Sequence, residues 1–515
     1  WGSRLVMNIG QFLTKRAYRE PTTEALFDVA SDRRFSFEEL NVRSNKTANA
    51  LLDSGVSAGD RVGLLLMNGV EFVETFFAAA KIGAVNVPLN MRLVADELEF
   101  ILKDSGTSVL IFSEEFAPVC AELASRGDKT DITTWIQVAG TPGDGVLEYN
   151  EWVGAAADTE IESTASGDDY VFIMYTSGTT GLPKGVIHSH DTVMWSILTG
   201  TASLDFRLED RFLNSLPLFH VGALNPVLAN VYAGGTTVLM RSFDPAESWR
   251  LITEEKINST LMVPAMLQFM QMTYNAEAHD LSALRWVLSG AAPVPVSLIE
   301  AYADLGVEIH QVYGLTETAG PGCVIIGDEA KNRIGSTGRA FFHGQVRVIR
   351  EDGTDCEPGE SGEVLLAGPN IMVGYWNRPE ATAESIVDGW LHTGDAGVLD
   401  EDGFLTIVDR IKDMLISGGE NIYPAEIENV LLSHKSISDA GVIGVPSKKW
   451  GESPLAVIVK SDDVSPEDVM AFCNAKLAPY KAIKVVEFVD VIPRNPSGKI
   501  LKRVLRDQYA EIELD

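Results

Sequence analysis

The sequence predicts an α/β protein with a large domain of mainly parallel sheets and a small α+β domain. Short apolar runs alternate with longer helical patterns over the first four-fifths of the chain, which is typical of parallel sheets covered by helices. The 515 residues exceed the ~250–300 at which one hydrophobic core stops growing. A second, denser mixture of helices and strands fills the last stretch, of about a hundred residues, a usual domain size.

The large domain is expected to cover residues 7–410. Its expected strands are apolar runs at 62–67, 109–112, 170–175, 236–240, 260–263 and 286–289. Apolar residues at helical spacing predict helices at 70–82 and 95–103. Shorter, glycine-punctuated strands at 345–350 and 362–366 predict a small β-rich subdomain after position 335.

The small domain is expected to cover residues 411–515. Its pattern predicts a helix at 424–432, strands at 440–445 and 456–460, and a helix at 466–476. It follows Asp409-Arg-Ile-Lys412, which marks the expected boundary.

Composition excludes several classes of protein. With 45% hydrophobic and 22% charged residues the chain is globular rather than disordered. A net charge of −32 repels a nucleic-acid backbone, so we expect no nucleic-acid partner. Six basic residues could still contact anionic lipid or a ligand phosphate if the fold clusters them, and the alternative is that they are scattered, solvated charges. The six residues are Lys15, Arg16, Arg19, Arg207, Arg211 and Arg241.

The four cysteines form neither a CxxC pair nor a zinc spacing, so we expect reduced, structural thiols. We find no apolar run of the ~18 residues that a spanning helix needs and no basic-then-apolar leader. A cytoplasmic protein is expected, with peripheral membrane contact as an open question.

The segment from Tyr175 to Val186 carries the strongest chemical signal. Its glycines let the backbone approach an anion, its hydroxyls supply donors, and Lys184 adds a positive charge, which together predict a polyphosphate cradle. It is not a Walker A loop, because Pro183 replaces the glycine before the lysine and Gly185 follows it. The alternative is an ordinary Gly/Thr-rich turn. The candidate residues are Thr176, Ser177, Gly178, Thr179, Thr180, Gly181 and Lys184.

This loop, which ends in Pro-Lys-Gly, resembles the signature of the adenylate-forming superfamily of acyl-CoA synthetases, adenylation domains and beetle luciferases. The resemblance continues through Gly290-Ala-Ala-Pro293 and Tyr313-Gly-Leu-Thr-Glu-Thr318 to the C-terminus. It implies that the chain converts a carboxylic acid and ATP to an acyl-adenylate and then transfers the acyl group to the thiol of coenzyme A.

By the same resemblance, Gly290, Ala291, Ala292, Tyr313 and Gly314 form the adenine pocket, with Tyr313 stacked on the base. Thr316 approaches the α-phosphate, and Glu317 with Thr176 holds Mg²⁺. A carboxylate and hydroxyls are suitable ligands for a hard cation beside phosphate oxygens.

The resemblance assigns the ribose hydroxyls to Asp395 and Arg410; the alternative for Asp395 is a turn or N-cap aspartate. Lys499, in Pro493-Arg-Asn-Pro-Ser-Gly-Lys499, corresponds to the catalytic lysine. An ammonium there would bridge the attacking carboxylate and the α-phosphate. Without the resemblance it would be a surface lysine.

For the second step the family rotates its small domain, and Lys412 matches the hinge position. Gly418 and Gly419 would let a pantetheine arm pass, or form a plain turn. Trp450 resembles a residue near CoA, or belongs to the core.

His220 matches the family histidine beside the acyl carboxylate, and we expect orientation or gating rather than base catalysis, since a carboxylate of pKa ~4 is already ionised. A core histidine is the alternative. Val221, Ala223 and Leu224 would line an acyl pocket.

Among subfamilies the chain is most similar to short bacterial fatty-acyl-CoA synthetases, so a medium- to long-chain fatty acid is expected first. Aryl acids such as cinnamates or benzoates are the main alternative. A luciferase-like oxygenase, a catalytically silent acyl- or AMP-binding homologue, and a carrier protein in place of CoA are the others. Oligomeric state and chain length are left open by the sequence.

Overall fold

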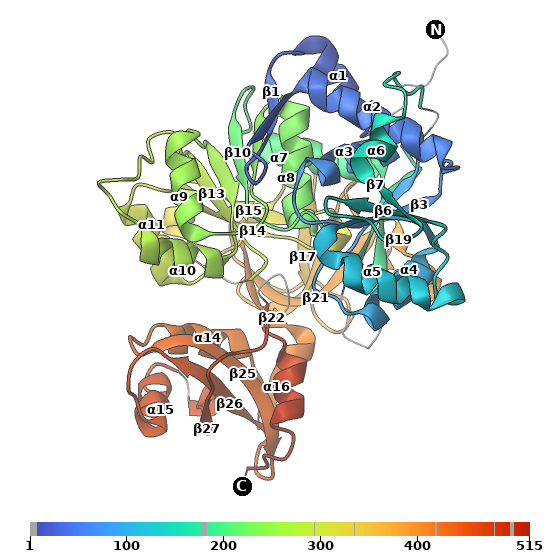
Figure 1. Ribbon diagram of the computed structural model, residues 1–515. Coiled ribbons are helices and arrows are strands. Elements are labelled where there is room, and N and C mark those ends of the chain that lie inside the picture. Colours follow the sequence, from blue (N-terminus) through green and yellow to red (C-terminus); the bar gives the residue numbers. More distant parts are fainter. Residues whose placement is uncertain are drawn as a thin grey trace.

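The computed structural model describes residues 8–163, 165, 167–176, 183–292, 294–333, 335–417, 420–477, 479–494 and 499–514. Their strands form four sheets, with eight, nine, five and five strands. Figure 1 shows the last sheet and its helices as a separate lobe, joined to the rest near β22 (Leu405–Arg410). The expected α/β class, with a large part and a smaller C-terminal part, is confirmed.

The eight-stranded sheet is parallel from β8 to β7, while β9 and β19 run antiparallel to their neighbours. The strands expected at 62–67, 109–112 and 170–175 are present in it. In spatial order its strands are β19 (Gly374–Tyr375), β9 (Lys184–Ser189), β8 (Tyr170–Thr176), β4 (Val85–Pro88), β3 (Arg61–Leu65), β5 (Thr107–Ser113), β6 (Thr134–Val138) and β7 (Val146–Glu148).

The nine-stranded sheet is parallel from β14 to β1, and its remaining strands are antiparallel. The strand expected at 260–263 is shorter and begins earlier, as β12. In spatial order the strands are β16 (Arg339–Ala340), β15 (Cys323–Ile325), β14 (Ile309–Tyr313), β13 (Trp286–Ser289), β12 (Ser259–Leu261), β10 (Arg211–Asn214), β11 (Thr236–Leu239), β1 (Glu24–Asp28) and β2 (Arg33–Ser36).

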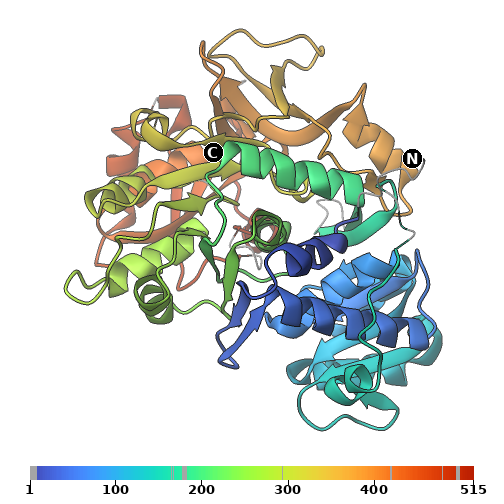
Figure 2. The same cartoon turned by 90° about the horizontal axis from the view of Figure 1, so that it is seen from above.

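Helices cover both sheets, which lie side by side as the blue-to-cyan and green-to-yellow parts of Figure 2. The helices of the large domain are α1 (Gln11–Arg19), α2 (Phe37–Asp53), α3 (Val70–Ile82), α4 (Ala95–Ser105), α5 (Ala117–Ser125), α6 (Tyr149–Gly154), α7 (His190–Ser203), α8 (Val221–Ala233), α9 (Pro245–Glu254), α10 (Pro264–Thr273), α11 (Val296–Asp304), α12 (Gly327–Asn332) and α13 (Pro379–Ser385).

The largest core joins the two sheets through helices. It contains Leu64 of β3 and Leu26 of β1, one from each sheet, together with Phe76 of α3 and Leu228 of α8. Helix α3 is apolar around most of its circumference and almost wholly buried, as expected for a helix packed on several sides. This packing fixes the sheet ends, where the candidate site lies.

A five-stranded antiparallel sheet follows, as the glycine-punctuated pattern predicted. Its strands are β17 (Gln345–Ile349), β18 (Ser361–Ala367), β21 (Trp390–Leu399), β20 (Ile386–Val387) and β22. It carries two of the candidate site residues on β21 and β22.

The C-terminal lobe has a sheet with helices packed on it. Its elements are β23 (Leu415–Ser417), β24 (Glu420–Ile422), α14 (Pro424–Leu432), β25 (Ile437–Ser447), β26 (Gly451–Lys460), α15 (Pro466–Asn474), β27 (Val485–Phe488) and α16 (Lys502–Gln508). Strands β25 and β26 are longer than expected because they pair with each other as a hairpin. The domain boundary after residue 410 stays a prediction. Every helix in the described ranges is too short or too polar to span a bilayer.

Candidate active site

The candidate residues of the large domain gather where strands end. Thr176 is the last residue of β8, Tyr313 is the last of β14, and Gly290 directly follows β13. Open α/β sheets bind ligands in the crevice beyond the carboxyl ends of their strands. The candidate residues therefore lie at the carboxyl ends of strands from two different sheets.

Two glycines of the predicted adenine pocket are required by close backbone contacts. A Cβ on Gly290 would lie 2.3 Å from the carbonyl oxygen of Val312, and one on Gly314 would lie 1.5 Å from that of Gly320. Ala291 adopts a φ of 66°, a left-handed conformation that is unusual outside glycine. The backbone is thus folded tightly around the end of β14.

Tyr313, Asp395 and Arg410 form one hydrogen-bonded group. The Tyr313 hydroxyl donates to Asp395 Oδ2 at 2.6 Å, and Arg410 Nε lies 2.6 Å from Asp395 Oδ1. Burial, and then the Asp395 carboxylate, raise the pKa of Tyr313, so its hydroxyl stays protonated. Asp395 lies within β21 rather than at a helix start, so it is not an N-cap. This arrangement fits a carboxylate oriented toward neutral hydroxyls.

A second group surrounds Lys184. Strands β8 and β9 pair Thr176 with Lys184. The ring of Tyr375 lies 5.0 Å from Lys184 Nζ, and its hydroxyl donates to Glu317 Oε1 at 2.8 Å. The cradle lysine and the proposed magnesium carboxylate are thus linked by one tyrosine. Ser177, Gly178, Thr179, Thr180 and Gly181 lie outside the described residues.

His188 of β9 supports the turn that carries Thr316. Its Nε2 lies 2.7 Å from the Thr316 carbonyl oxygen and its Nδ1 lies 3.0 Å from Thr192 Oγ1. Burial lowers the pKa of His188 to about 4, so the ring is neutral. Because a carbonyl only accepts, Nε2 donates to Thr316 and Nδ1 accepts from Thr192.

His220 stands at the start of α8, beside the same turn. The residue is partly buried. Its Nε2 is buried and has no hydrogen-bond partner among the described residues, and burial lowers its pKa to about 4. Asn225 of α8 donates to the carbonyl oxygen of Ala319 at 2.7 Å, which joins this helix to the turn after Glu317. Of the predicted acyl-pocket residues, Ala223 and Leu224 are buried and Val221 is partly buried.

The remaining predicted residues lie on or near the small lobe. The backbone of Lys412 belongs to a short 3₁₀ turn, Ile411–Asp413, directly after β22. Lys499 is partly buried and directly precedes Ile500, which pairs with Arg494. Trp450 is 42% exposed, and Lys449 Nζ lies 4.8 Å from its ring. Its exposure excludes the alternative of a core tryptophan. Gly418 and Gly419 lie outside the described residues.

Sequence reasoning missed Tyr375 and His188. His188 could have been noticed as a histidine inside the apolar strand that follows Lys184. Tyr375 lies in Gly-Tyr-Trp-Asn, a sequence that on its own is typical of a turn; only the pairing of β19 with β9 places it beside Lys184.

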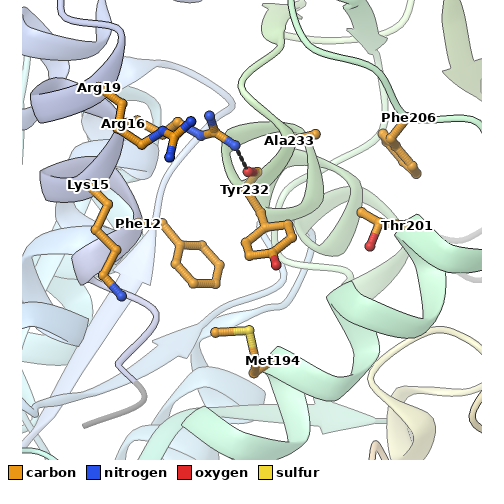
Figure 3. A pocket seen from close by; sticks show the side chains of 9 residues that line it. All are labelled: Phe12, Lys15, Arg16, Arg19, Met194, Thr201, Phe206, Tyr232 and Ala233. Carbon is orange, nitrogen blue, oxygen red and sulfur yellow. Dashed lines mark hydrogen bonds between the residues drawn. The ribbon is translucent and has the colours of Figure 1, made fainter. Parts of the chain in front are cut away.

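The expected basic cluster is divided. Figure 3 shows Lys15, Arg16 and Arg19 of α1 at a groove of about 510 Å³ between α1, α7 and α8. Arg16 donates to the carbonyl oxygens of Val231 and Tyr232 and so caps α8. Arg16 and Arg19 also pair with Glu20. Arg207, Arg211 and Arg241 do not line this groove, and each pairs with an acidic side chain.

The family profile described as "AMP-binding enzyme" matches residues 13–376, and that of its C-terminal domain matches residues 426–499. The chain belongs to the AMP-binding enzyme family. The resemblance seen in the motifs is thereby confirmed.

Members of this family are similar over nearly the whole chain. The long-chain-fatty-acid–CoA ligase FadD13 of Mycobacterium tuberculosis is 42% identical, over 98% of this chain and 99% of that protein. A feruloyl-CoA synthase of Amycolatopsis is 40% identical, over 97% and 99%. The structure of o-succinylbenzoate CoA synthetase from Bacillus subtilis with its acyl-adenylate has a TM-score of 0.87 and 34% identity, over 96% and 98%.

Proposed function

We propose that the chain is an AMP-forming acyl-CoA synthetase that acts on fatty acids. A carboxylate oxygen attacks the α-phosphorus of ATP, the bond to the β-phosphate oxygen breaks, and pyrophosphate leaves. The CoA thiol then attacks the acyl carbon and loses its proton, while AMP departs. The observation that carries the proposal is that the Tyr313–Asp395–Arg410 group and the Lys184–Tyr375–Glu317 group lie at two ends of one turn.

The first group suits the nucleoside end of ATP and the second its phosphates. Asp395 would accept hydrogen bonds from the ribose hydroxyls, with Arg410 holding the carboxylate in place. Tyr313 would pack against the adenine, and Lys184 would neutralise phosphate oxygens.

The described residues fit the magnesium ion of Mg–ATP only if phosphate oxygens supply part of its coordination. No cluster of three His, Cys, Asp or Glu side chains able to hold a metal occurs among the described residues. Glu317 accepts the Tyr375 hydrogen bond at Oε1, and its Oε2 accepts none from the described residues. Thr176 adds a hydroxyl. These two residues would hold the ion together with phosphate oxygens, and the ion would neutralise phosphate charge.

His220 would orient the acyl carboxylate. Its buried, unpartnered Nε2 is the kind of group that a carboxylate oxygen satisfies. With a pKa of about 4 the ring is neutral at physiological pH. It can donate one hydrogen bond, and the carboxylate needs no base because it is already ionised.

The second step assigns further roles to the small lobe. Lys499 would act only while the adenylate forms. Rotation about Lys412 would then turn a different face of the small lobe toward the active site. On that face, Gly418, Gly419 and Trp450 would contact CoA. The match of the C-terminal profile through residue 499 supports this assignment.

A fatty acid is preferred to an aryl acid because of helix α8. Its 13 residues run from His220 to the apolar groove at Tyr232, about 20 Å at 1.5 Å per residue. A long aliphatic chain bound parallel to the helix would extend toward that groove, a length that an aryl acid does not have. The similarity to FadD13 supports a fatty acid as the substrate. The similarity to feruloyl-CoA synthase supports an aryl acid as the alternative substrate.

The test is AMP release from Mg–ATP and CoA across aliphatic acids from acetate to beyond palmitate, with benzoate, cinnamate and ferulate alongside. Turnover that peaks on long aliphatic acids is the expected result. Turnover on aryl acids alone would keep the reaction and replace the substrate. Absence of both acid-dependent ATP–pyrophosphate exchange and AMP release would favour the silent homologue instead.

The groove also supports a peripheral contact with anionic lipid. Lys15 and Arg19 lie at its rim, and the neighbouring Tyr18 is 88% exposed. Flotation with phosphatidylglycerol vesicles should recover the protein, whereas phosphatidylcholine vesicles should not. A Lys15→Glu/Arg19→Glu variant that floats equally well would contradict the contact.

A further inference from the structure

Tyr375 contacts both charged groups that would handle the phosphates. Its hydroxyl donates to Glu317 Oε1 at 2.8 Å, and the centroid of its ring is 5.0 Å from Lys184 Nζ. A cation within about 6 Å of an aromatic face is attracted by the ring. One side chain is therefore positioned against a carboxylate and an ammonium at once.

Backbone pairing explains how Tyr375 reaches this place. Strand β19 pairs with β9, so Tyr375 lies opposite Val186, close to the start of the strand at Lys184. In the same segment, the Met372 amide donates to the Glu317 carbonyl oxygen at 2.8 Å. The segment is thus bonded to β9 on one side and to the Glu317 turn on the other.

The neighbours of Tyr375 hold it in one orientation. Its amide donates to Thr382 Oγ1 at 2.8 Å, and the Trp376 indole donates to the Asp104 carbonyl oxygen at 2.9 Å. Gly374 has a φ of 157°, and a Cβ there would lie 2.8 Å from Thr382. The Tyr375 hydroxyl is the donor in its bond to Glu317, because a carboxylate oxygen only accepts.

The consequence concerns the two charges themselves. An ammonium and a carboxylate that contact the same tyrosine would attract each other, and a direct ion pair would turn both away from a ligand. Among the described residues Lys184 forms no ion pair within 4.0 Å. The Tyr375 hydroxyl uses one oxygen of Glu317 and leaves the other for a cation.

We propose that Tyr375 is a positioning residue for adenylation, which separates Lys184 from Glu317 and aims both at the Mg²⁺–polyphosphate part of ATP. This rests on the proposed function, because it assumes that Lys184 and Glu317 bind that part of the substrate. Preorganised charges of this kind lower the barrier without moving during the reaction.

The test compares Tyr375→Phe with wild type. Phenylalanine keeps the ring beside Lys184 and removes only the hydroxyl. Equilibrium ATP binding is measured by calorimetry with and without Mg²⁺, and the gain in affinity due to Mg²⁺ should fall about 10-fold, as expected for losing a hydrogen bond to a charged group. The KM for Mg–ATP should rise, with CoA transfer from supplied acyl-adenylate unchanged.

Tyr302→Phe is the matched control. Its buried hydroxyl donates to the Leu267 carbonyl oxygen at 2.8 Å, in the core beneath α10 and α11. It loses the same group, so it reports any general effect of a missing tyrosine hydroxyl. We expect a lower melting temperature with the Mg²⁺-dependent gain in ATP affinity intact.

A double-mutant cycle decides whether Tyr375 acts through Glu317. In a Glu317→Ala background, Tyr375→Phe should change ATP affinity in Mg²⁺ by less than about twofold, since coupled residues are not additive. A full additional 10-fold loss, or a Mg²⁺-dependent gain in Tyr375→Phe equal to that of wild type, would overturn the proposal. Failure of the wild type to bind ATP would instead overturn the proposed function.

Discussion

At the scale of single residues, the site depends on pairs of side chains that fix each other's direction. Asp395 is held by Tyr313 and Arg410, and only a few per cent of its surface is exposed. Such a carboxylate does not need to reorganise when a ligand arrives, which is the usual source of strong electrostatic stabilisation. Lys499 differs, because it follows the proposed hinge at Lys412 in the chain, so its place in the site would depend on the position of the lobe.

Replacing Lys499 by Ala should remove adenylation and spare thioester formation. The ammonium would stabilise charge only while the carboxylate attacks the α-phosphate, so ATP–pyrophosphate exchange should fall about 100- to 1,000-fold. Transfer from supplied acyl-adenylate to CoA should stay within about twofold. Lys435→Ala, at an exposed lysine of the same lobe, is the control. Equal loss of both half-reactions would assign Lys499 another role.

At the scale of elements, the candidate residues lie on strands and on the short turns that follow them. The turn after β14 is closed by hydrogen bonds from the Gly322 amide to Tyr313 and from Asn370 to the Thr318 carbonyl oxygen. It presents Thr316 and Glu317 from a rigid base. The turn at Ile411–Asp413 would have the opposite role, since the proposed rotation of the lobe requires it to change conformation.

Gly314→Ala should damage the first turn. The new Cβ would lie 1.5 Å from the Gly320 carbonyl oxygen, so the backbone must shift, at a cost of about 2 kcal/mol or more. Melting temperature and ATP affinity should both fall. Gly143→Ala introduces the same methyl group where nothing lies within 4 Å, and it should match wild type. Wild-type ATP affinity in Gly314→Ala would show that the turn can relax.

Lys412→Pro should restrict the hinge. Proline fixes φ, so the turn can no longer change conformation between the two steps. Acyl transfer to CoA should fall about 10-fold or more while pyrophosphate exchange persists. The two half-reactions are measured separately in single-turnover experiments. Unchanged overall turnover would place the pivot elsewhere.

At the scale of the whole molecule, buried histidines contribute to how stability depends on pH. His188 and His190 are fully buried and His220 is partly buried. Burial lowers the pKa of each to about 4 from 6.5. The Ile9 amide donates to His190 Nδ1, which requires that atom to be unprotonated. The folded protein thus holds three neutral histidines that the unfolded chain would protonate in mild acid.

The melting temperature should therefore fall as the pH drops. These groups have depressed pKa values, so their contribution is fully present above about pH 6.5 and is lost progressively down to about pH 4, where the unfolded chain binds more protons. Calorimetric scans at pH 7.5, 6 and 5 measure the change. A melting temperature that is constant across this range would show that the histidines exchange protons without unfolding.

Much of the fold could be predicted because buried strands and helices have characteristic local patterns of apolar residues in the sequence. Parallel strands buried on both faces give continuous apolar runs, and β3, β5 and β8 were found from such runs. The lengths of β25 and β26 were not, because their ends are fixed by pairing with each other rather than by composition. The candidate residues came from motif resemblance, and their roles remain predictions.

The sequence alone determined the fold class, the glycine-rich segment that ends at Lys184, and the order of the candidate motifs, since each is encoded within a short stretch. Only the tertiary structure decided which of those motifs touch. Tyr375 meets Glu317 across 58 residues, and His188 meets the Thr316 carbonyl across 128. Such contacts depend on how two sheets pack, and no local pattern of residues records that geometry.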